Sequence, residues 1–182
     1  ENAICENAPD TRYLPQDCPG DRVIRTLKPT LLSEKDGKRI YDAGEMMTGY
    51  PLFCAPGKKQ EIRVRFGELL DADGNLDENK IYNQHMTFYT DEKPRTLQTY
   101  FTWFCFRYFE VSGDCEVSDC LVIHSDVAVS SAFSSDIPVL NWIYDAYLRT
   151  QLANMHGGIP SDCPHTERRG YTGDGQLVCH AA

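Results

Sequence analysis

Residues 102–111 read Thr-Trp-Phe-Cys-Phe-Arg-Tyr-Phe-Glu-Val and decide the fold of this chain. Aromatic and β-branched residues dominate the run, and such residues favour a β-strand that is packed inside a core. A second run, residues 61–66, reads Glu-Ile-Arg-Val-Arg-Phe and alternates polar with apolar residues. That alternation is typical of a strand with one face in water. The two runs together predict a core built from β-sheet.

Similar short runs recur on both sides of these two, from residue 21 to about residue 129. Clusters of Gly, Pro, Asp and Asn separate them, as turns separate strands. Seven or so short strands at this spacing predict an antiparallel β-sandwich. The predicted strands are Arg22–Leu27, Arg39–Tyr41, Thr48–Cys54, Glu61–Phe66, His85–Tyr89, Thr102–Val111 and Cys120–Val129.

The pattern changes to helix after residue 134. Ser134-Ser135-Asp136 offers N-cap residues, and Pro138 suits a first helical turn. Apolar residues then recur at three- and four-residue spacing. We expect a helix from about Ile137 to Met155, ended by Gly157-Gly158, and a second helix that starts near Asp174–Gly175. The predicted fold class is therefore mainly β with a C-terminal α part.

The composition is that of an ordinary globular protein. The chain has 182 residues, of which 41% are hydrophobic and 25% charged. Its net charge of −9 disfavours binding to nucleic acid, because an acidic surface repels phosphates. No apolar run reaches the roughly 18 residues of a membrane span, so no membrane partner is expected. The first residues are polar, resemble no signal peptide and lack a starting Met, so we expect the chain to begin within a longer protein.

The eight cysteines are predicted to be free thiols. No CxxC pair is present, which disfavours a structural zinc site. Cys54, Cys105 and Cys120 lie in or beside apolar runs, where cysteine commonly acts as a small buried hydrophobe. Free thiols are typical of a reducing compartment and favour a cytoplasmic location.

The richest candidate site is the loop Gly157–Gln176, which reads GGIPSDCPHTERRGYTGDGQ. It holds three acids, Asp162, Glu167 and Asp174, beside the pair Arg168-Arg169 and the aromatic Tyr171. Glycosidic cleavage needs two carboxyl groups, one to protonate the leaving oxygen and one to activate water or attack carbon. Crowded acids repel one another, so we expect at least one raised carboxyl pKa here. A polar surface loop is the alternative interpretation.

Other motifs fit a chemical role less well. The run Asp71–Asp77 resembles a calcium loop, but Gly74 stands fourth and Tyr82 twelfth, so we expect a solvated hairpin turn. Asp162, Cys163, His165 and Glu167 mix metal-ligand classes without a helical His spacing, and we predict no metal. Cys163 and His165 are too close in sequence for a typical nucleophile pair. The serine elbow GxSxG is absent from the sequence.

The segment Ile159–Gln176 resembles the active-site signature of bacterial α-L-rhamnosidases of glycoside hydrolase family 78, which reads roughly DCP-x-x-ER-x-GW-x-GD-x-Q. Segments upstream resemble the same family in the same order. They are Tyr41–Gly49, Arg65–Leu70 with Asp73-Gly74, Phe101–Tyr108, His124–Asp126, Phe133 and Leu140-Asn141.

The resemblance implies a β-sandwich followed by the first helices of an incomplete (α/α)₆ barrel. Residues 1–20 would be a linker or the tail of a preceding domain, residues 21–130 the sandwich, and residues 131–182 the start of the six-hairpin glycosidase domain. The implied reaction is hydrolysis of a terminal α-L-rhamnoside with inversion, without any cofactor. Its substrate would be a rhamnose-containing oligosaccharide or glycoside.

The resemblance also implies roles for single residues. Glu167 matches the general acid, Asp162 and Asp174 match acids that hold rhamnose hydroxyls, and Arg168 matches the Arg after the general acid. Tyr171 stands where the family usually has a Trp that lines the sugar subsite. The family's general base is a Glu farther downstream, so we expect a fragment that is inactive alone. The alternatives are another inverting (α/α)₆ glycosidase or phosphorylase, and a non-catalytic carbohydrate-binding sandwich.

Overall fold

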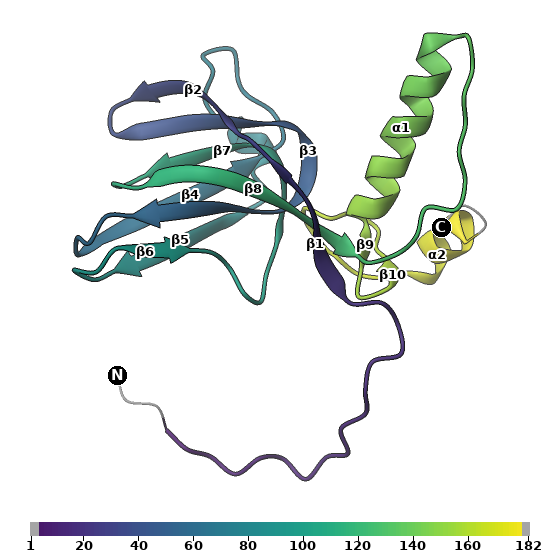
Figure 1. The fold of residues 1–182 in the computed structure, drawn as a ribbon, viewed down its shortest axis with the longest axis horizontal. Helices are drawn as coiled ribbons and strands as arrows, with labels where there is room; N and C mark the ends of the chain where they lie inside the picture. The colour runs from purple at the N-terminus through teal and green to yellow at the C-terminus, as the bar shows by residue number, and fades with distance from the viewer. Residues whose placement is uncertain (1–3, 180–182) are drawn as a thin grey trace.

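The computed structural model describes residues 4–179, which form a curled antiparallel sheet followed by two helices (Figure 1). The main strand order is β1-β8-β3-β7-β4-β5, and β2 and β6 both pair with β3. The predicted fold class, a sandwich-like β domain with a C-terminal α part, is confirmed. The strands are β1 (Asp21–Leu27), β2 (Thr30–Lys35), β3 (Lys38–Ala55), β4 (Gln60–Gly67), β5 (His85–Thr90), β6 (Arg95–Leu97), β7 (Phe104–Ser112) and β8 (Glu116–Ser125).

The long strand β3 organises the sheet and merges two predicted strands. Its first residues pair with β2, its last with β8 and β6, and the pairing with β7 shifts register between Asp42 and Met47. Gly44 lies in this irregular stretch at φ 91°, a backbone conformation that favours glycine. A strand that changes partners at such a bend curls the sheet. The polar, glycine-containing sequence around Gly44 predicts an interruption between two strands, although β3 continues through it.

Other strand predictions were shifted or incomplete. The strands β2 and β6 were missed because they are short and exposed, with weak alternation. The last predicted strand, Cys120–Val129, is instead β8 at Glu116–Ser125, since its polar start pairs with the end of β3.

The core lies between the layers of the curled sheet and is rich in phenylalanine. The ring of Phe66 lies 4.2 Å from Phe104, 4.8 Å from Phe106 and 6.4 Å from Phe109, measured between centroids. Phe66, Phe106 and Phe109 have no solvent exposure. Burying a Phe side chain contributes roughly 1.5–3 kcal/mol. The predicted core strands 61–66 and 102–111 therefore both supply the core.

The turn after β4 confirms the interpretation of Asp71–Asp77 as a solvated hairpin turn. The Asp71 carboxylate accepts hydrogen bonds from the backbone N–H groups of Asp73 and Asn75, each at 2.9 Å. The backbone hydrogen bond from Asn75 is the main reason that the pKa of Asp71 lies below its usual value. Leu70 and Leu76 pair across the turn.

The C-terminal part begins with α1 (Pro138–Ala153), which packs beside the sheet (Figure 1). The predicted end of this helix at Gly157-Gly158 was wrong, because Asn154 already caps it. The two glycines, at φ 63° and 77°, instead form the turn between β9 (Met155–His156) and β10 (Ile159–Pro160). Two positive φ angles are what a tight two-residue hairpin requires. The second helix, α2 (Thr172–Val178), starts two residues before its predicted position.

The start of α1 also differs from the expected cap. Ile137 is the N-cap residue and makes no side-chain cap hydrogen bond, while Pro138 occupies the first turn as predicted. Ser135 contributes by accepting the Ile137 N–H at 3.1 Å. Val139, Trp142 and Ile143 are more than half exposed on this helix. No helix in the described residues is long and apolar enough to cross a membrane.

All eight cysteines are free thiols, as predicted. Cys105 and Cys120 are buried, but the expected burial of Cys54 was wrong. Side chains alternate between the two faces of a strand, and the neighbours Phe53 and Ala55 point into the core. Cys54 therefore faces solvent.

Candidate functional site

The acidic loop, defined as Ser161–Tyr171, connects β10 to α2 and closes on itself. The Asp162 N–H donates to the carbonyl of Arg169 at 3.0 Å, and the Arg169 N–H donates to the Asp162 carboxylate at 3.2 Å. The Arg168 N–H donates to the Cys163 carbonyl at 3.2 Å. Because backbone groups satisfy one another across it, the loop has a defined shape.

Asp162 is a hydrogen-bond acceptor within this loop rather than a crowded acid. Partial burial tends to raise the pKa of its carboxyl, but hydrogen bonds from the N–H groups of Cys163 and Arg169 outweigh that effect and lower the pKa. Repulsion between crowded acids would raise a carboxyl pKa in this loop, but the pKa of Asp162 moves in the opposite direction. Hydrogen bonds to the charged form have decided the outcome.

Glu167 and Tyr171 are the two predicted site residues that the structure brings into direct contact. Both are exposed, and the Tyr171 hydroxyl donates to the Glu167 carboxylate. That hydrogen bond is the largest cause of the raised pKa of Tyr171, since ionising the phenol would place two negative charges together. The contact fixes the orientation of the Glu167 carboxylate on the outer side of the loop.

Asp174 lies apart from the loop, in the first turn of α2. A carboxylate near a helix N-terminus interacts favourably with the helix dipole, an effect of about 0.3–1 kcal/mol. Asp174 therefore has a structural role at the start of α2, in addition to its predicted contact with the sugar.

Arg168 points beneath the loop, onto the sheet. It is half-buried, and its guanidinium donates to the Trp103 carbonyl at 2.7 Å, to Gln84 Oε1 at 3.2 Å and to the Pro164 carbonyl at 3.1 Å. The guanidinium carbon also lies 4.3 Å from the centre of the Trp103 ring. Burial lowers the pKa of Arg168. In this arrangement the planar donor fork holds the loop in place, while the predicted substrate contact of Arg168 stays a prediction.

The backbone of Arg168 carries strain that its side chain offsets. Its φ of 56° lies in the left-handed region, which costs a non-glycine residue roughly 1–2 kcal/mol. The three hydrogen bonds and the contact with the Trp103 ring stabilise this conformation. The loop therefore turns at Arg168 because the side chain is anchored.

Gln84 is a positioning residue of the candidate site that the sequence did not reveal. It is 3% exposed, accepts the Cys105 N–H at 2.8 Å and donates to the Cys105 carbonyl at 2.7 Å. Its Oε1 also accepts from Arg168. A glutamine followed by His85, at the start of a strand, gives no sequence signal of this role, because its partners lie far along the chain.

The hairpin that leads into the loop is fixed by Asp21. This carboxylate contacts His156 Nδ1 at 2.7 Å, and it accepts the Gly157 N–H at 2.7 Å and the Ser125 hydroxyl at 3.2 Å. The His156 ring stacks on Trp103 at 3.7 Å. Burial lowers the pKa of His156, against the opposing effect of Asp21. The Asp21 carboxylate contacts His156 and Gly157 of the hairpin and also Ser125 of β8. It therefore holds the hairpin against the sheet.

Within the loop residues weighed as a metal set, the Cys163 thiol donates to the Asp162 carboxylate at 3.3 Å, while His165 and Glu167 have partners outside the set. His165 turns away to Glu68, with its Nδ1 at 3.2 Å from a carboxylate oxygen, and its ring packs on Tyr82 at 4.3 Å. Cys163 contacts the Thr166 hydroxyl at 2.6 Å. Glu167 contacts Tyr171 instead.

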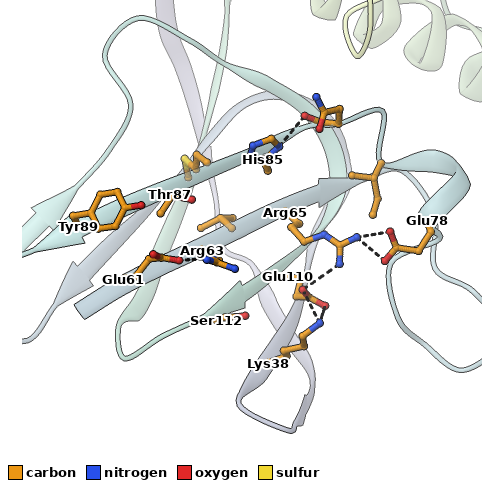
Figure 2. Close-up of a pocket in the computed structure, with 14 residues that line it drawn as sticks. Lys38, Glu61, Arg63, Arg65, Glu78, His85, Thr87, Tyr89, Glu110 and Ser112 are labelled. Carbon is orange, nitrogen blue, oxygen red and sulfur yellow. Dashed lines mark hydrogen bonds and ion pairs between the residues drawn. The ribbon is translucent and has the colours of Figure 1, made fainter. Parts of the chain in front are cut away.

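A separate cleft of about 720 Å³ lies on the sheet face formed by β4, β5 and β7 (Figure 2). Arg65 stands between Glu78, at 2.5 Å, and the buried Glu110, at 3.5 Å. Lys38 also pairs with Glu110, at 3.3 Å, and Arg63 pairs with a neighbouring carboxylate. Because these cations are already paired, the cleft does not concentrate charge of one sign, and the acidic loop is the better candidate site.

Two family models match the chain. The bacterial alpha-L-rhamnosidase concanavalin-like domain matches residues 32–129, and the bacterial alpha-L-rhamnosidase 6 hairpin glycosidase domain matches residues 128–182. An α-L-rhamnosidase of Formosa agariphila is 23% identical, over 97% of this chain and 20% of that protein.

Solved structures agree with the sequence matches. An α-L-rhamnosidase from Dictyoglumus thermophilum has a TM-score of 0.81 and 29% identity, over 88% of this chain and 19% of that one. The Streptomyces avermitilis α-L-rhamnosidase complexed with L-rhamnose has a TM-score of 0.78 and 25% identity, over 90% and 17%. The chain thus spans about a fifth of the length of each of these three relatives.

Proposed function

Because this chain belongs to the bacterial α-L-rhamnosidase family, we propose that it supplies the general acid Glu167 for hydrolysis of terminal α-L-rhamnosides with inversion of configuration. The observation that carries this proposal is the match of residues 162–176 to the family signature, with Glu167 exposed on an anchored loop. The relative that is solved with L-rhamnose supports rhamnose as the sugar.

The proposed mechanism uses two carboxyl groups on opposite sides of the bond. Glu167 gives its proton to the leaving oxygen, while a second carboxylate activates a water on the other face of the sugar. Such pairs stand roughly 6.5–9.5 Å apart, which leaves room for the water. In this proposal the second carboxylate is a Glu outside the 182 residues, and no cofactor takes part.

The other loop residues receive supporting roles in the proposal. Asp162 and Asp174 bind rhamnose hydroxyls through charge-assisted hydrogen bonds. Tyr171 packs against the sugar and orients Glu167, and Arg168 contributes to the subsite from its place behind the loop. The proposed division of the chain is a linker at residues 1–20, a sandwich at residues 21–130 and the start of the six-hairpin domain at residues 131–182. The extents of the two family matches support that division.

The test is an assay of the complete gene product, with the 182-residue chain in parallel. Two substrates are compared: p-nitrophenyl α-L-rhamnoside, which has a good leaving group, and an alkyl α-L-rhamnoside, which has a poor one. General acid–base groups typically contribute about 10²–10⁴-fold, so Glu167→Gln should lower kcat by that order on a substrate with a poor leaving group. Glu92→Gln removes an exposed carboxylate in the turn between β5 and β6 and serves as the matched control.

The dependence on the leaving group distinguishes a general acid from a residue that only binds. A nitrophenolate leaves with little help from a proton, whereas an alkoxide needs it. The Glu167→Gln defect should therefore be much larger on an alkyl α-L-rhamnoside than on the nitrophenyl substrate. Equal defects on the two substrates would rule out general-acid catalysis by Glu167. Turnover of another sugar in preference would favour a different inverting glycosidase, and sugar binding without any turnover would favour a binding sandwich.

A further inference from the structure

Three side chains that bind metals elsewhere converge at one point beside the sheet. Glu68 follows β4, Cys105 lies on β7, and His165 comes from the acidic loop. One ligand atom from each lies within 4.8 Å of the other two. The three residues are far apart in sequence, so the tertiary fold alone assembles them.

The spacing of these atoms is close to that of a tetrahedral metal site. Zinc bonds of about 2.0–2.3 Å place neighbouring ligand atoms roughly 3.3–3.7 Å apart. The Glu68 oxygen and His165 Nδ1 are already 3.2 Å apart. Closing the widest pair from at most 4.8 Å requires side-chain movements of about 1 Å, well within a rotamer adjustment.

Surrounding residues hold two of the ligands in place. Gln84 bonds both the N–H and the carbonyl of Cys105, which fixes the backbone that carries the thiol. The His165 ring packs on Tyr82. Outer contacts that orient ligands are a regular feature of metal sites.

The cluster is open to solvent on one side. Glu68, Cys105 and His165 all line a cavity of about 560 Å³. The side chains of Glu68 and His165 are 20% and 23% exposed. An ion has a path into this cavity, and a water molecule has room to complete its coordination.

We propose that Glu68, Cys105 and His165 form a binding site for a borderline divalent cation, with Zn²⁺ as the best match and water as a further ligand. A thiolate, an imidazole and a carboxylate together suit zinc, whereas Mg²⁺ and Ca²⁺ prefer oxygen ligands alone. The site does not depend on the proposed hydrolysis.

Metal binding would displace a proton from the thiol. Burial, followed by the charge of Glu68, raises the pKa of Cys105 to about 12, so the free protein holds this thiol protonated. The ion takes the thiolate and the proton leaves to solvent. An ion bound here joins His165 to Cys105 on β7 and to Glu68 directly after β4, and therefore holds the acidic loop against the sandwich two residues before Glu167.

The test is a Co²⁺ titration of the reduced, metal-free 182-residue chain. Cobalt replaces zinc in tetrahedral sites and absorbs visible light there, and a thiolate ligand adds a sulfur-to-cobalt charge-transfer band. We expect saturation at one equivalent, loss of the spectrum when Zn²⁺ is added, and a rise in the thermal midpoint with Zn²⁺ concentration.

Two ligand variants and two control variants test the assignment. Cys105→Ser should lose the charge-transfer band and weaken binding by at least about tenfold, since even outer-shell losses cost 10–100-fold. Glu68→Gln should weaken binding comparably but keep the band. Cys120→Ser, which alters another buried thiol of the same sheet, should bind as the unmodified chain does. Cys163→Ser tests the set within the loop and should also bind normally.

Circular dichroism of each variant shows whether it folds. If Cys105→Ser does not fold, Glu68→Gln decides the question, because Glu68 is partly exposed and outside the core. Absence of stoichiometric binding, unchanged affinity in Glu68→Gln, or loss of the charge-transfer band in Cys163→Ser would each overturn the proposal.

Discussion

Replacing Arg168 with Ala should release the acidic loop from the sheet. The guanidinium makes hydrogen bonds of 2.7, 3.2 and 3.1 Å to Trp103, Gln84 and Pro164, and it lies 4.3 Å from the Trp103 ring. Alanine makes none of these contacts and keeps the costly left-handed φ of 56°. The variant therefore retains the strain without the interactions that offset it.

The magnitude follows from these contacts. A hydrogen bond to a charged group contributes about 1.5–3 kcal/mol, and a cation–π contact about 0.5–2 kcal/mol. The sum is reduced because the half-buried charge loses hydration and because the contacts are not additive. We expect Arg168→Ala to lower the free energy of unfolding by about 3 kcal/mol. If the loop opens locally first, the loss stops at the free energy of that opening.

The assay combines urea unfolding with amide hydrogen exchange. The N–H groups of Arg169 and residue 168 donate to Asp162 and Cys163 across the loop, so their exchange reports whether the loop is closed. Arg169→Ala is the matched control, because this exposed neighbour has the same charge and keeps its backbone hydrogen bond. A surface change of this kind should stay within about 0.5 kcal/mol.

A conservative variant tests the geometry. Arg168→Lys keeps the positive charge but loses the planar fork, so it should fall between the unmodified protein and Arg168→Ala. Equal effects of the alanine changes at positions 168 and 169, or slow loop exchange in Arg168→Ala, would refute the anchoring argument.

Three further predictions concern single groups. Burial lowers the pKa of His156, so on acidification the unfolded chain takes up this proton before the folded protein does. The free energy of unfolding should therefore fall as the pH drops below about 6.5. Thermal melts of His156→Phe should lack this pH dependence. The pKa of Tyr171 should return toward its ordinary value in Glu167→Gln, followed by NMR of the labelled phenol ring, and an unchanged titration would contradict the contact. A Cβ at Gly49 would lie 1.8 Å from a backbone oxygen of β8. In urea unfolding, Gly49→Ala should therefore lower the free energy of unfolding by about 3 kcal/mol or more. The control Gly20→Ala should leave it unchanged, because the space around Gly20 is open.

The parts of the fold that were predictable rest on local patterns. The alternation in residues 61–66 places Ile62, Val64 and Phe66 in the core and Arg63 in solvent. The three- and four-residue spacing after Pro138 predicts α1. Both patterns are readable because burial repeats with the period of the element itself. The continuity of β3 through Gly44 could not be predicted from the sequence, because pairing with different neighbouring strands keeps this segment extended.

The candidate site divides in the same way. Glu167 and Tyr171 are four residues apart, so a loop motif can identify both. Gln84 and Trp103, which hold Arg168, lie more than 60 residues upstream of it. No spacing rule links residues at such separations, because the intervening chain can take many paths.

The sequence by itself determined the β-rich core, the C-terminal helix and the resemblance of the acidic loop to the family signature. Each depends on residues that are neighbours in the chain. Only the tertiary structure decided that Arg168 anchors the loop, that His165 meets Glu68 and Cys105, and that Asp21 clamps the hairpin. The partner of a polar side chain depends on strand register and on which segments the sheet brings together, and those are set by packing of the whole chain.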